Sequence, residues 1–245
     1  TLTEVFRQAE QSAIIRNAHA VNRGQSPDLK NKQNDFFFLC RRSPDRLVQM
    51  VVDLCRTRLP ENMGIPAGQI QVLSPTRKGE TGTVSLNRAL QAALNPPSPG
   101  KRQKAWGDMV FRVGDRVMQT KNNDEVANGD IGEVIGIFRK DQKMVMRVDF
   151  GDGRVMEYQE EDYWPLTLAY AITVHKAQGS EYPMAILPML PCFRWMLRRN
   201  IFYTAVTRAR ERFIIVGSKR AIAQAIRTDY ISRRNTMFGY RIRKI

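Results

Sequence analysis

The stretch Leu168-Ala-Tyr-Ala-Ile-Thr-Val-His-Lys-Ala-Gln-Gly-Ser-Glu-Tyr182 is the most informative part of this chain. Residues at helical spacing along it are Leu168, Ala171, Ile172 and His175. This spacing predicts a helix that ends before Gly179, where a left-handed backbone suits glycine. Polar groups gathered at one corner need polar partners when they are buried, and a nucleotide or a nucleic-acid backbone would supply them. These polar residues are Thr173, His175, Lys176, Gln178, Ser180 and Glu181.

The composition indicates a globular protein with a polyanionic partner. The chain has 245 residues, a net charge of +15 and 42% hydrophobic residues. So strong a basic excess favours nucleic acid, although a solvated basic surface is the alternative. No apolar run approaches the roughly 20 residues that span a bilayer, and the first residues do not resemble a signal peptide. The cysteines, Cys40, Cys55 and Cys192, are scattered, so we expect no disulfide framework, no metal site and a cytoplasmic setting.

The first hundred residues alternate between helix and strand. Helical spacing covers residues 3–22, 44–59 and 84–94, and Ser43 is the expected N-cap of the second helix. Apolar runs at 36–40 and 69–73 predict strands, the first of them buried. This alternation predicts an α/β fold with a parallel sheet.

The pattern changes after a Pro- and Ser-rich linker at residues 95–104. Short strands are expected at 115–120, 133–138, 144–150 and 154–158, separated by turn residues such as Asn128-Gly129. These strands predict a small antiparallel barrel inserted into the α/β domain. The α/β pattern resumes at Leu166, with a last buried strand at 213–217 and a helix at 219–226.

Two segments in this order resemble motifs V and VI of the superfamily-one helicases. The first reads Ala-Tyr-Ala-x-Thr-Val-His-Lys-x-Gln-Gly-Ser-Glu and the second Thr-Ala-Val-Thr-Arg-Ala, which is most similar to the RecD-like branch, with Pif1-like helicases as a close variant. The resemblance implies a RecA-like parallel sheet with helices on both faces, interrupted by an SH3-like antiparallel β-barrel. The implied domains are the two parts of the second motor domain, 1–104 and 164–226, the SH3-like insertion, 105–163, and a basic tail, 227–245.

The resemblance also assigns roles to residues. Arg208 corresponds to the motif VI arginine finger, and a guanidinium suits the charge that develops on phosphate oxygens. Arg7 and its weaker companion Gln8 match motif IV, while Gly179 and Glu181 lie near the nucleotide. The implied nucleic-acid contacts are Thr76, Arg77, Lys78, Thr173, His175, Lys176, Gln178 and Ser180.

Structural alternatives exist for several of these residues. Arg208 could be a surface arginine in a basic stretch, and Glu181 could pair with Lys176. His175 could be a satisfied structural histidine, and residues 74–79 could be a simple basic connection.

The chain lacks sequence elements that an ATPase needs. Gly79–Gly82 has no Gly-Lys-Ser/Thr, and Asp124-Glu125 follows no buried strand, so it predicts a hairpin turn. The resemblance therefore implies the C-terminal part of an ATP-dependent 5′–3′ DNA helicase of DNA repair and recombination. Its implied partners are single-stranded DNA, ATP with Mg²⁺, and a missing N-terminal motor domain of the same polypeptide, without which we expect no hydrolysis. The alternative is a stand-alone, non-catalytic module that binds single-stranded nucleic acid.

Overall fold

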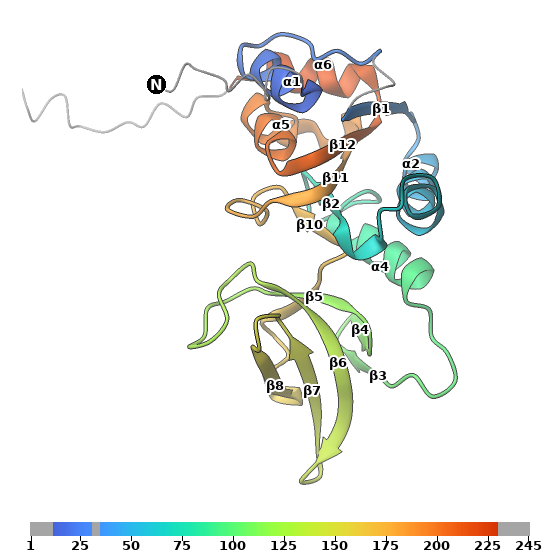
Figure 1. Ribbon diagram of the computed structural model, residues 1–245, viewed down its shortest axis with the longest axis vertical. Coiled ribbons are helices and arrows are strands. Elements are labelled where there is room, and N and C mark those ends of the chain that lie inside the picture. The colour runs from blue at the N-terminus through green and yellow to red at the C-terminus, as the bar shows by residue number, and fades with distance from the viewer. Residues whose placement is uncertain (1–11, 31–34, 230–245) are drawn as a thin grey trace, which may run out of the picture.

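The computed structural model describes residues 12–30 and 35–229, which form two lobes (Figure 1). One lobe holds a parallel sheet with its helices, and the other holds antiparallel strands. The expected fold class is confirmed. In the described part of the chain, no helix is long and apolar enough to cross a membrane. No three His, Cys, Asp or Glu side chains within those same ranges lie close enough together to hold a metal ion.

The parallel sheet has five strands. The order is β1 (Phe36–Cys40), β12 (Ala209–Gly217), β11 (Tyr182–Met189), β2 (Ile70–Ser74) and β10 (Ala171–Thr173). Every pairing is parallel. The strands β11 and β2 inside the sheet are almost entirely buried. Continuous apolar runs are typical of strands covered on both faces. The expectation of a buried strand at 36–40 was wrong beyond Phe36, because β1 lies at the sheet edge and its end is exposed.

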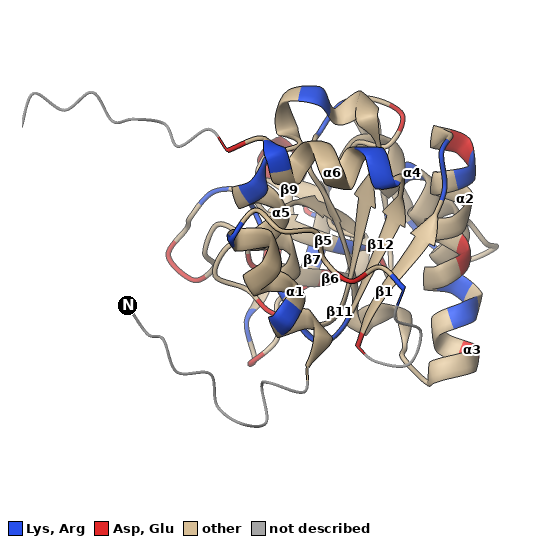
Figure 2. Cartoon of the chain, turned by 90° about the horizontal axis from the view of Figure 1, so that it is seen from above, with Lys and Arg blue, Asp and Glu red and all other residues tan. Residues whose placement is uncertain are grey.

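Helices cover both faces of this sheet (Figure 2). On one face α1 (Ala13–Asn22) packs against α5 (Arg199–Val206), which contacts α6 (Lys219–Arg227). On the other face α2 (Pro44–Asp53) contacts α4 (Thr83–Leu94). Beyond residue 53 the helix continues through a π-helical turn, Leu54–Arg58, into α3 (Leu59–Met63), so it runs past the expected end at 59.

The first described helix, α1, begins at Ala13. Ser12 is the N-cap of α1, and its Oγ accepts from the N–H of Ile15. The carboxylate of Asp35, just before β1, accepts from the N–H groups of Ala13 and Ile14. Residues 3–11 of the expected helix lie outside the described residues.

The second lobe contains a five-stranded antiparallel sheet and a separate hairpin. The sheet order is β8 (Val155–Gln159), β7 (Lys143–Asp149), β6 (Ile131–Lys140), β5 (Arg116–Gln119) and β9 (Leu166–Leu168). The hairpin pairs β3 (Gln103–Trp106) with β4 (Met109–Arg112). Short 3₁₀ turns lie at Ala67–Gln69, Glu160–Asp162 and Pro191–Met196.

Two boundaries differ from those expected. β9 pairs with β5, so the antiparallel sheet extends past residue 163 to Leu168. β3 begins at Gln103, within the last two residues of the segment expected to be a linker. Asp124 and Glu125 lie exposed in the loop between β5 and β6, as a turn requires.

The helix expected within 168–179 was wrong. Leu168 ends β9 in one sheet, Ala171–Thr173 form β10 in the other, and residues 174–179 form turns. Leu168, Ala171 and Ile172 are buried because the chain crosses between two sheets here, whereas His175 is exposed. Asn87 of α4 holds this crossing, since its side chain donates to the carbonyls of Leu168 and Ala171 and accepts from the Ala171 N–H. Gly179 does adopt a positive φ, of 88°.

A buried carboxylate joins the two lobes. Asp115, 0% exposed just before β5, accepts hydrogen bonds from the side chains of Gln91 and Asn95 in and after α4. It also accepts from the Arg112 N–H and from the hydroxyl of Tyr170, which lies between β9 and β10. Burial raises the pKa of the Tyr170 hydroxyl, which keeps it a donor. The carboxylate therefore fixes the hairpin, α4 and the crossing segment together.

We expect the three thiols to differ in reactivity. Burial raises the pKa of the Cys55 thiol to about 12, whereas Cys40 and Cys192 are exposed. Because the thiolate is the reactive form, a disulfide reagent near neutral pH should modify Cys40 and Cys192 in the folded protein and Cys55 only after denaturation. Mass spectrometry of labelled peptides would check this, and rapid labelling of Cys55 in the folded state would contradict the packing around α2 and β5.

Candidate functional site

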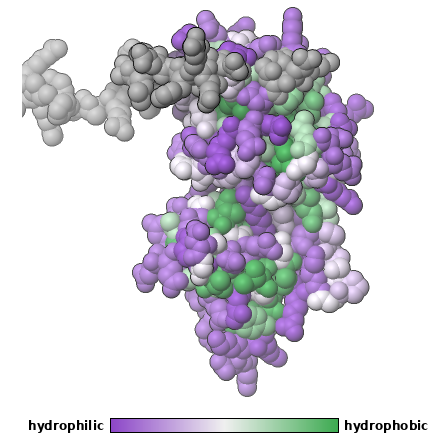
Figure 3. Space-filling model, in the orientation of Figure 1, coloured by the Kyte–Doolittle hydropathy of each residue, from purple (hydrophilic) through white to green (hydrophobic). Residues whose placement is uncertain are grey.

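A groove of about 570 Å³ lies where the two lobes meet, and Figure 3 shows apolar surface exposed at this waist. Its α/β side comes from β10 and the start of α4, where Thr83 and Asn87 lie. Its other side comes from the β3–β4 hairpin and from β5, β9 and the residues just before β9. Parallel strands present their carboxyl ends at one edge of a sheet, which is where open α/β sheets bind ligands. The groove lies at that edge, beside the ends of β2 and β10.

Aromatic and cationic side chains line the same groove. Trp106 and Trp164 lie on the antiparallel side, and Trp164 is 48% exposed. Lys121 places its Nζ 4.1 Å from the centre of that ring. Arg77 and Lys176 contribute positive charge from the α/β side. Exposed aromatic rings beside cations form the kind of surface on which bases stack while phosphates are neutralised.

The loop after β2 is held against the start of α4. The carbonyls of Thr76 and Arg77 accept from the N–H groups of Thr83 and Val84. A Cβ on Gly82 would lie 2.6 Å from the Arg77 carbonyl oxygen, so this close approach requires glycine. The backbone is therefore fixed while the side chains of Arg77 and Lys78 remain exposed.

The turn after β10 runs from the groove, at the carboxyl ends of the strands, to the opposite edge of the sheet, where the strands begin. Thr173 is level with Ser74 at the end of β2, while Met184 of β11 is level with Ile70 at its start. Four residues of strand correspond to about 13 Å. Residues 174–181 therefore run from the carboxyl ends of the strands back to their amino ends. In most parallel sheets a helix makes this connection.

Arg208 lies at that opposite edge, between α5 and β12. Its Nη1 donates to the carbonyl of Ser180 at 3.0 Å, and its Nε to the carbonyl of Thr204 at 3.3 Å. Its own carbonyl accepts from the N–H of Tyr182 at 2.8 Å. Among the described residues it makes no ion pair with a carboxylate. A partly buried guanidinium that is positioned by carbonyls and not paired with a carboxylate is suited to bind an anionic ligand.

The residues expected to form one site divide between these two places. Arg77, Thr173 and Lys176 line the groove, and Thr76 and Lys78 lie in the adjoining loop. Ser180 lies beside Arg208, and Glu181 follows it with its side chain exposed. His175, Gln178 and Gly179 are exposed along the turn that joins the two places. Arg7 and Gln8 lie outside the described residues.

Two details bear on the alternatives for these residues. Lys176 does not pair with Glu181, because its Nζ donates to the side chain of Asn128 in the β5–β6 loop at 2.6 Å. His175 is exposed, which argues against a satisfied core histidine. Lys176 thus also connects the two lobes across the groove.

Sequence reasoning missed part of the groove. It gave no role to Trp106, Met109 or Asn87. Trp106 stands in the short polar segment Ala105-Trp-Gly-Asp108, where an isolated aromatic before a turn was an available signal.

Comparison with known proteins identifies both lobes. The family model described as the ATP-dependent RecD-like DNA helicase SH3 domain matches residues 86–150. The model of the UvrD-like helicase C-terminal domain matches residues 168–216. In fold the chain is similar to the Pif1 helicase of Candida albicans, with a TM-score of 0.54 and 18% identity over 98% of this chain and 59% of that one. Fold and motifs together define a domain of the superfamily-one helicases.

The curated relatives narrow this class. The ATP-dependent RecD2 DNA helicase of Deinococcus radiodurans is 40% identical over 246 residues, 99% of this chain and 32% of the relative. The RecBCD enzyme subunit RecD of Mycobacterium tuberculosis is 29% identical over 162 residues, 64% of this chain and 26% of that protein. The chain belongs to the RecD-like branch and spans about a third of the length of its RecD2 relative.

Proposed function

We propose that this chain is the C-terminal part of an ATP-dependent DNA helicase that moves 5′ to 3′ along single-stranded DNA. The relative with 40% identity is named an ATP-dependent RecD2 DNA helicase, which supports ATP-driven work on DNA. A Pif1 helicase of the same fold has been crystallised with ADP-AlF3 and ssDNA. The basic charge of +15 agrees with a nucleic-acid partner.

One observation carries the proposal: the turn after β10 joins the groove to Arg208. Its first end holds Thr173 and Lys176 in the groove, and its second end holds Ser180 against the guanidinium. A shift of this turn would therefore move groove residues and Arg208 together. Coupling of a DNA site to a nucleotide site needs such a shared element.

The proposed nucleotide site lies at the edge that carries Arg208. ATP with Mg²⁺ would bind between this edge and an N-terminal motor domain that supplies the phosphate cradle. Arg208, with Arg7 as its predicted companion, would stabilise the charge on the γ-phosphate oxygens. Gly179, Glu181 and Gln8 stay predicted neighbours of the nucleotide. Because this side supplies only part of the site, the chain alone should hydrolyse essentially no ATP.

The proposed DNA site is the groove with its adjoining loop and turn. Bases would stack on Trp106 and Trp164 while Arg77 and Lys176 neutralise phosphates. The predicted contacts Thr76, Lys78, Thr173, His175 and Gln178 would follow the strand along the rim and the first part of the turn. Ser180 stays a predicted contact, but it lies beside Arg208 at the opposite edge. Binding of this kind depends on salt and tolerates many sequences.

We expect Trp106→Ala and Trp164→Ala each to weaken oligo-dT binding by about 5- to 150-fold, since stacking contributes about 1–3 kcal/mol per base. Trp195→Ala is the matched control, because Trp195 is 74% exposed and lies outside the groove. Fluorescence anisotropy with labelled oligo-dT at constant salt would measure the affinities. Equal effects of all three substitutions would rule out the groove as the DNA site.

A stand-alone, non-catalytic DNA-binding module is the second candidate. The groove favours it, since stacking on an exposed aromatic ring and neutralisation of phosphates need no nucleotide. This candidate gives Arg208 no function in catalysis. Substitution of Arg208 therefore separates the two candidates.

A further inference from the structure

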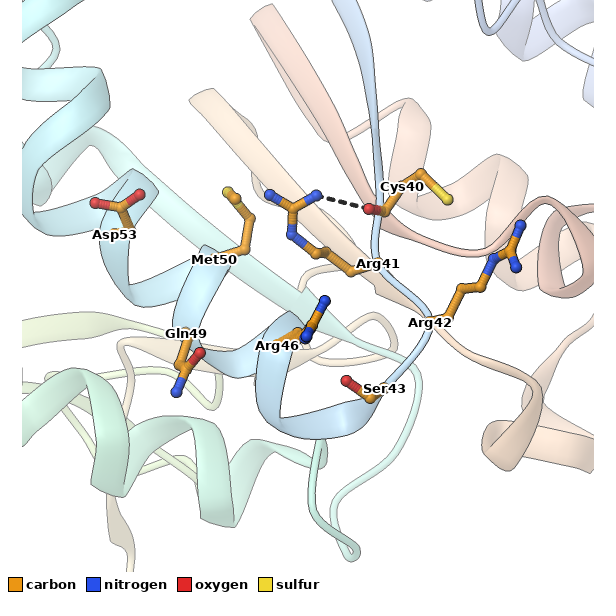
Figure 4. Close-up of a pocket in the computed structure, with 8 residues that line it drawn as sticks. All are labelled: Cys40, Arg41, Arg42, Ser43, Arg46, Gln49, Met50 and Asp53. Atoms are coloured by element: carbon orange, nitrogen blue, oxygen red, sulfur yellow. Dashed lines mark hydrogen bonds between the residues drawn. The ribbon is translucent and has the colours of Figure 1, made fainter.

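Three arginines surround a separate hollow of about 1020 Å³ at the end of β1. Arg41 and Arg42 follow the last residue of the strand, and Arg46 lies in the first turn of α2. Figure 4 shows Arg41 extending over the α2 side of the strand end and Arg42 extending to the other side. Neither the nucleotide edge nor the groove uses these residues.

The positive charge of this cluster is not neutralised within the described chain. Arg42 and Arg46 form no ion pair there, and Nη1 of Arg41 donates to the backbone carbonyl of Cys40 at 2.7 Å. Asp53, the acidic residue that lines the hollow, is paired with Arg58 at 2.6 Å. Guanidinium groups match phosphate oxygens with paired hydrogen bonds.

The start of α2 adds hydrogen-bond donors beside this cluster. Ser43 is the N-cap residue, yet its side chain makes no capping hydrogen bond. The expectation of a side-chain cap there is thus not met. The first N–H groups of a helix attract anions. Pro44 has no N–H and Asp45 places a carboxylate in the same turn, so the N–H groups of Asp45 and Arg46 are the donors that remain. The arginines and these N–H groups therefore favour the same kind of ligand.

The position of the cluster links it to the groove. The strand ends of β1, β2 and β10 lie at one edge of the parallel sheet, and α2 contacts α4. The groove includes the start of α4, and the cluster includes the start of α2. β1 and β2 are three strands apart in the sheet, about 14 Å, which is roughly four nucleotides of stacked strand. A strand that leaves the groove past Arg77 would reach the cluster within that length.

We propose that Arg41, Arg42 and Arg46 form a second phosphate-binding subsite for the same single strand, beyond the groove. This inference rests on the proposed function of the groove as a DNA site. The subsite would lengthen the occupied strand by a few nucleotides and would read no base, because guanidinium contacts to phosphates carry no sequence information.

The test compares short and long strands in the intact protein that carries this chain. Oligo-dT of about 5 nucleotides should fill the groove alone, and oligo-dT of about 20 nucleotides should reach both places. For Arg42→Ala/Arg46→Ala we expect a loss of roughly 10- to 30-fold for the long strand at about 0.1 M salt, from two lost phosphate contacts. The slope of log affinity against log salt should fall by about 1.4. Affinity for the short strand should stay within about twofold.

Arg139→Ala/Lys140→Ala is the matched control, because it removes two positive charges at the tip of the β6–β7 hairpin, away from the parallel sheet. Its long-strand affinity should change little. The subsite is refuted if Arg42→Ala/Arg46→Ala binds the long strand as wild type does, or if both lengths are weakened equally. Failure of the wild-type protein to bind the short strand would instead refute the groove. Substitution of both arginines by lysine should recover part of the affinity, since charge is kept and paired hydrogen bonds are lost.

Discussion

Arg208→Ala should lower the DNA-stimulated ATPase rate of the intact protein by about 10²- to 10³-fold, the range seen when one group that stabilises transition-state charge is removed. The reason is geometric. Carbonyls of Ser180 and Thr204 hold the guanidinium at the sheet edge, and among the described residues no carboxylate neutralises it. The positive charge is thus positioned and available for phosphate oxygens. Single-stranded DNA affinity should stay close to wild type, because Arg208 lies at the edge opposite the groove.

Arg210→Ala is the control for this experiment. Arg210 lies two residues further along, at the start of β12, and its side chain is exposed. We expect its ATPase rate to stay within about twofold of wild type, as for most surface substitutions. Arg208→Lys keeps the charge but loses the paired N–H donors of the guanidinium group, so it should recover little activity. An unchanged ATPase in Arg208→Ala, with DNA binding retained, would favour the non-catalytic module.

The sequence predicted the fold where each segment belongs to one sheet. The alternation of helix and strand up to residue 94 and the apolar run at 213–217 were confirmed, because a buried parallel strand needs a continuous apolar run. The short strands between 115 and 159 were also confirmed, since turn residues separate them. Local patterns suffice for such elements.

Local patterns failed where burial came from more than one element. Leu168 and Ile172 are buried in different sheets, and their spacing matched a helix only by coincidence. The same limit applies to the site. The order of the motifs predicted functional roles for Arg208 and Lys176. It could not predict that Trp106 and Arg77 line the same groove, because this depends on how the β3–β4 hairpin packs on α4. Ser180 is likewise separated from the groove by the length of the strands, because the groove lies at their carboxyl ends and Ser180 at their amino ends.

Asp115→Ala should destabilise the chain by about 3–5 kcal/mol, the largest effect on folding that we expect. The substitution would leave the side chains of Gln91 and Asn95 and the hydroxyl of Tyr170 without their acceptor in a buried site. Each buried donor left unsatisfied costs about 1–3 kcal/mol, and the loss of one partner from a buried charged network is particularly unfavourable. Urea unfolding followed by tryptophan fluorescence would measure the change in free energy.

The same substitution tests whether the joint between the lobes shapes the groove. Asp115 accepts from the Arg112 N–H in the hairpin that carries Trp106, while Gln91 donates to the carbonyl of Val110 in that hairpin. Tyr170→Phe removes one of these hydrogen bonds and should cost about 1 kcal/mol, with a smaller loss of oligo-dT affinity than Asp115→Ala. Asp124→Ala, in an exposed loop, should change stability by less than about 0.5 kcal/mol. If Asp115→Ala unfolded no more readily than Asp124→Ala, the carboxylate would not hold the lobes together, and the groove would owe its shape to the crossing segment and Asn87 alone.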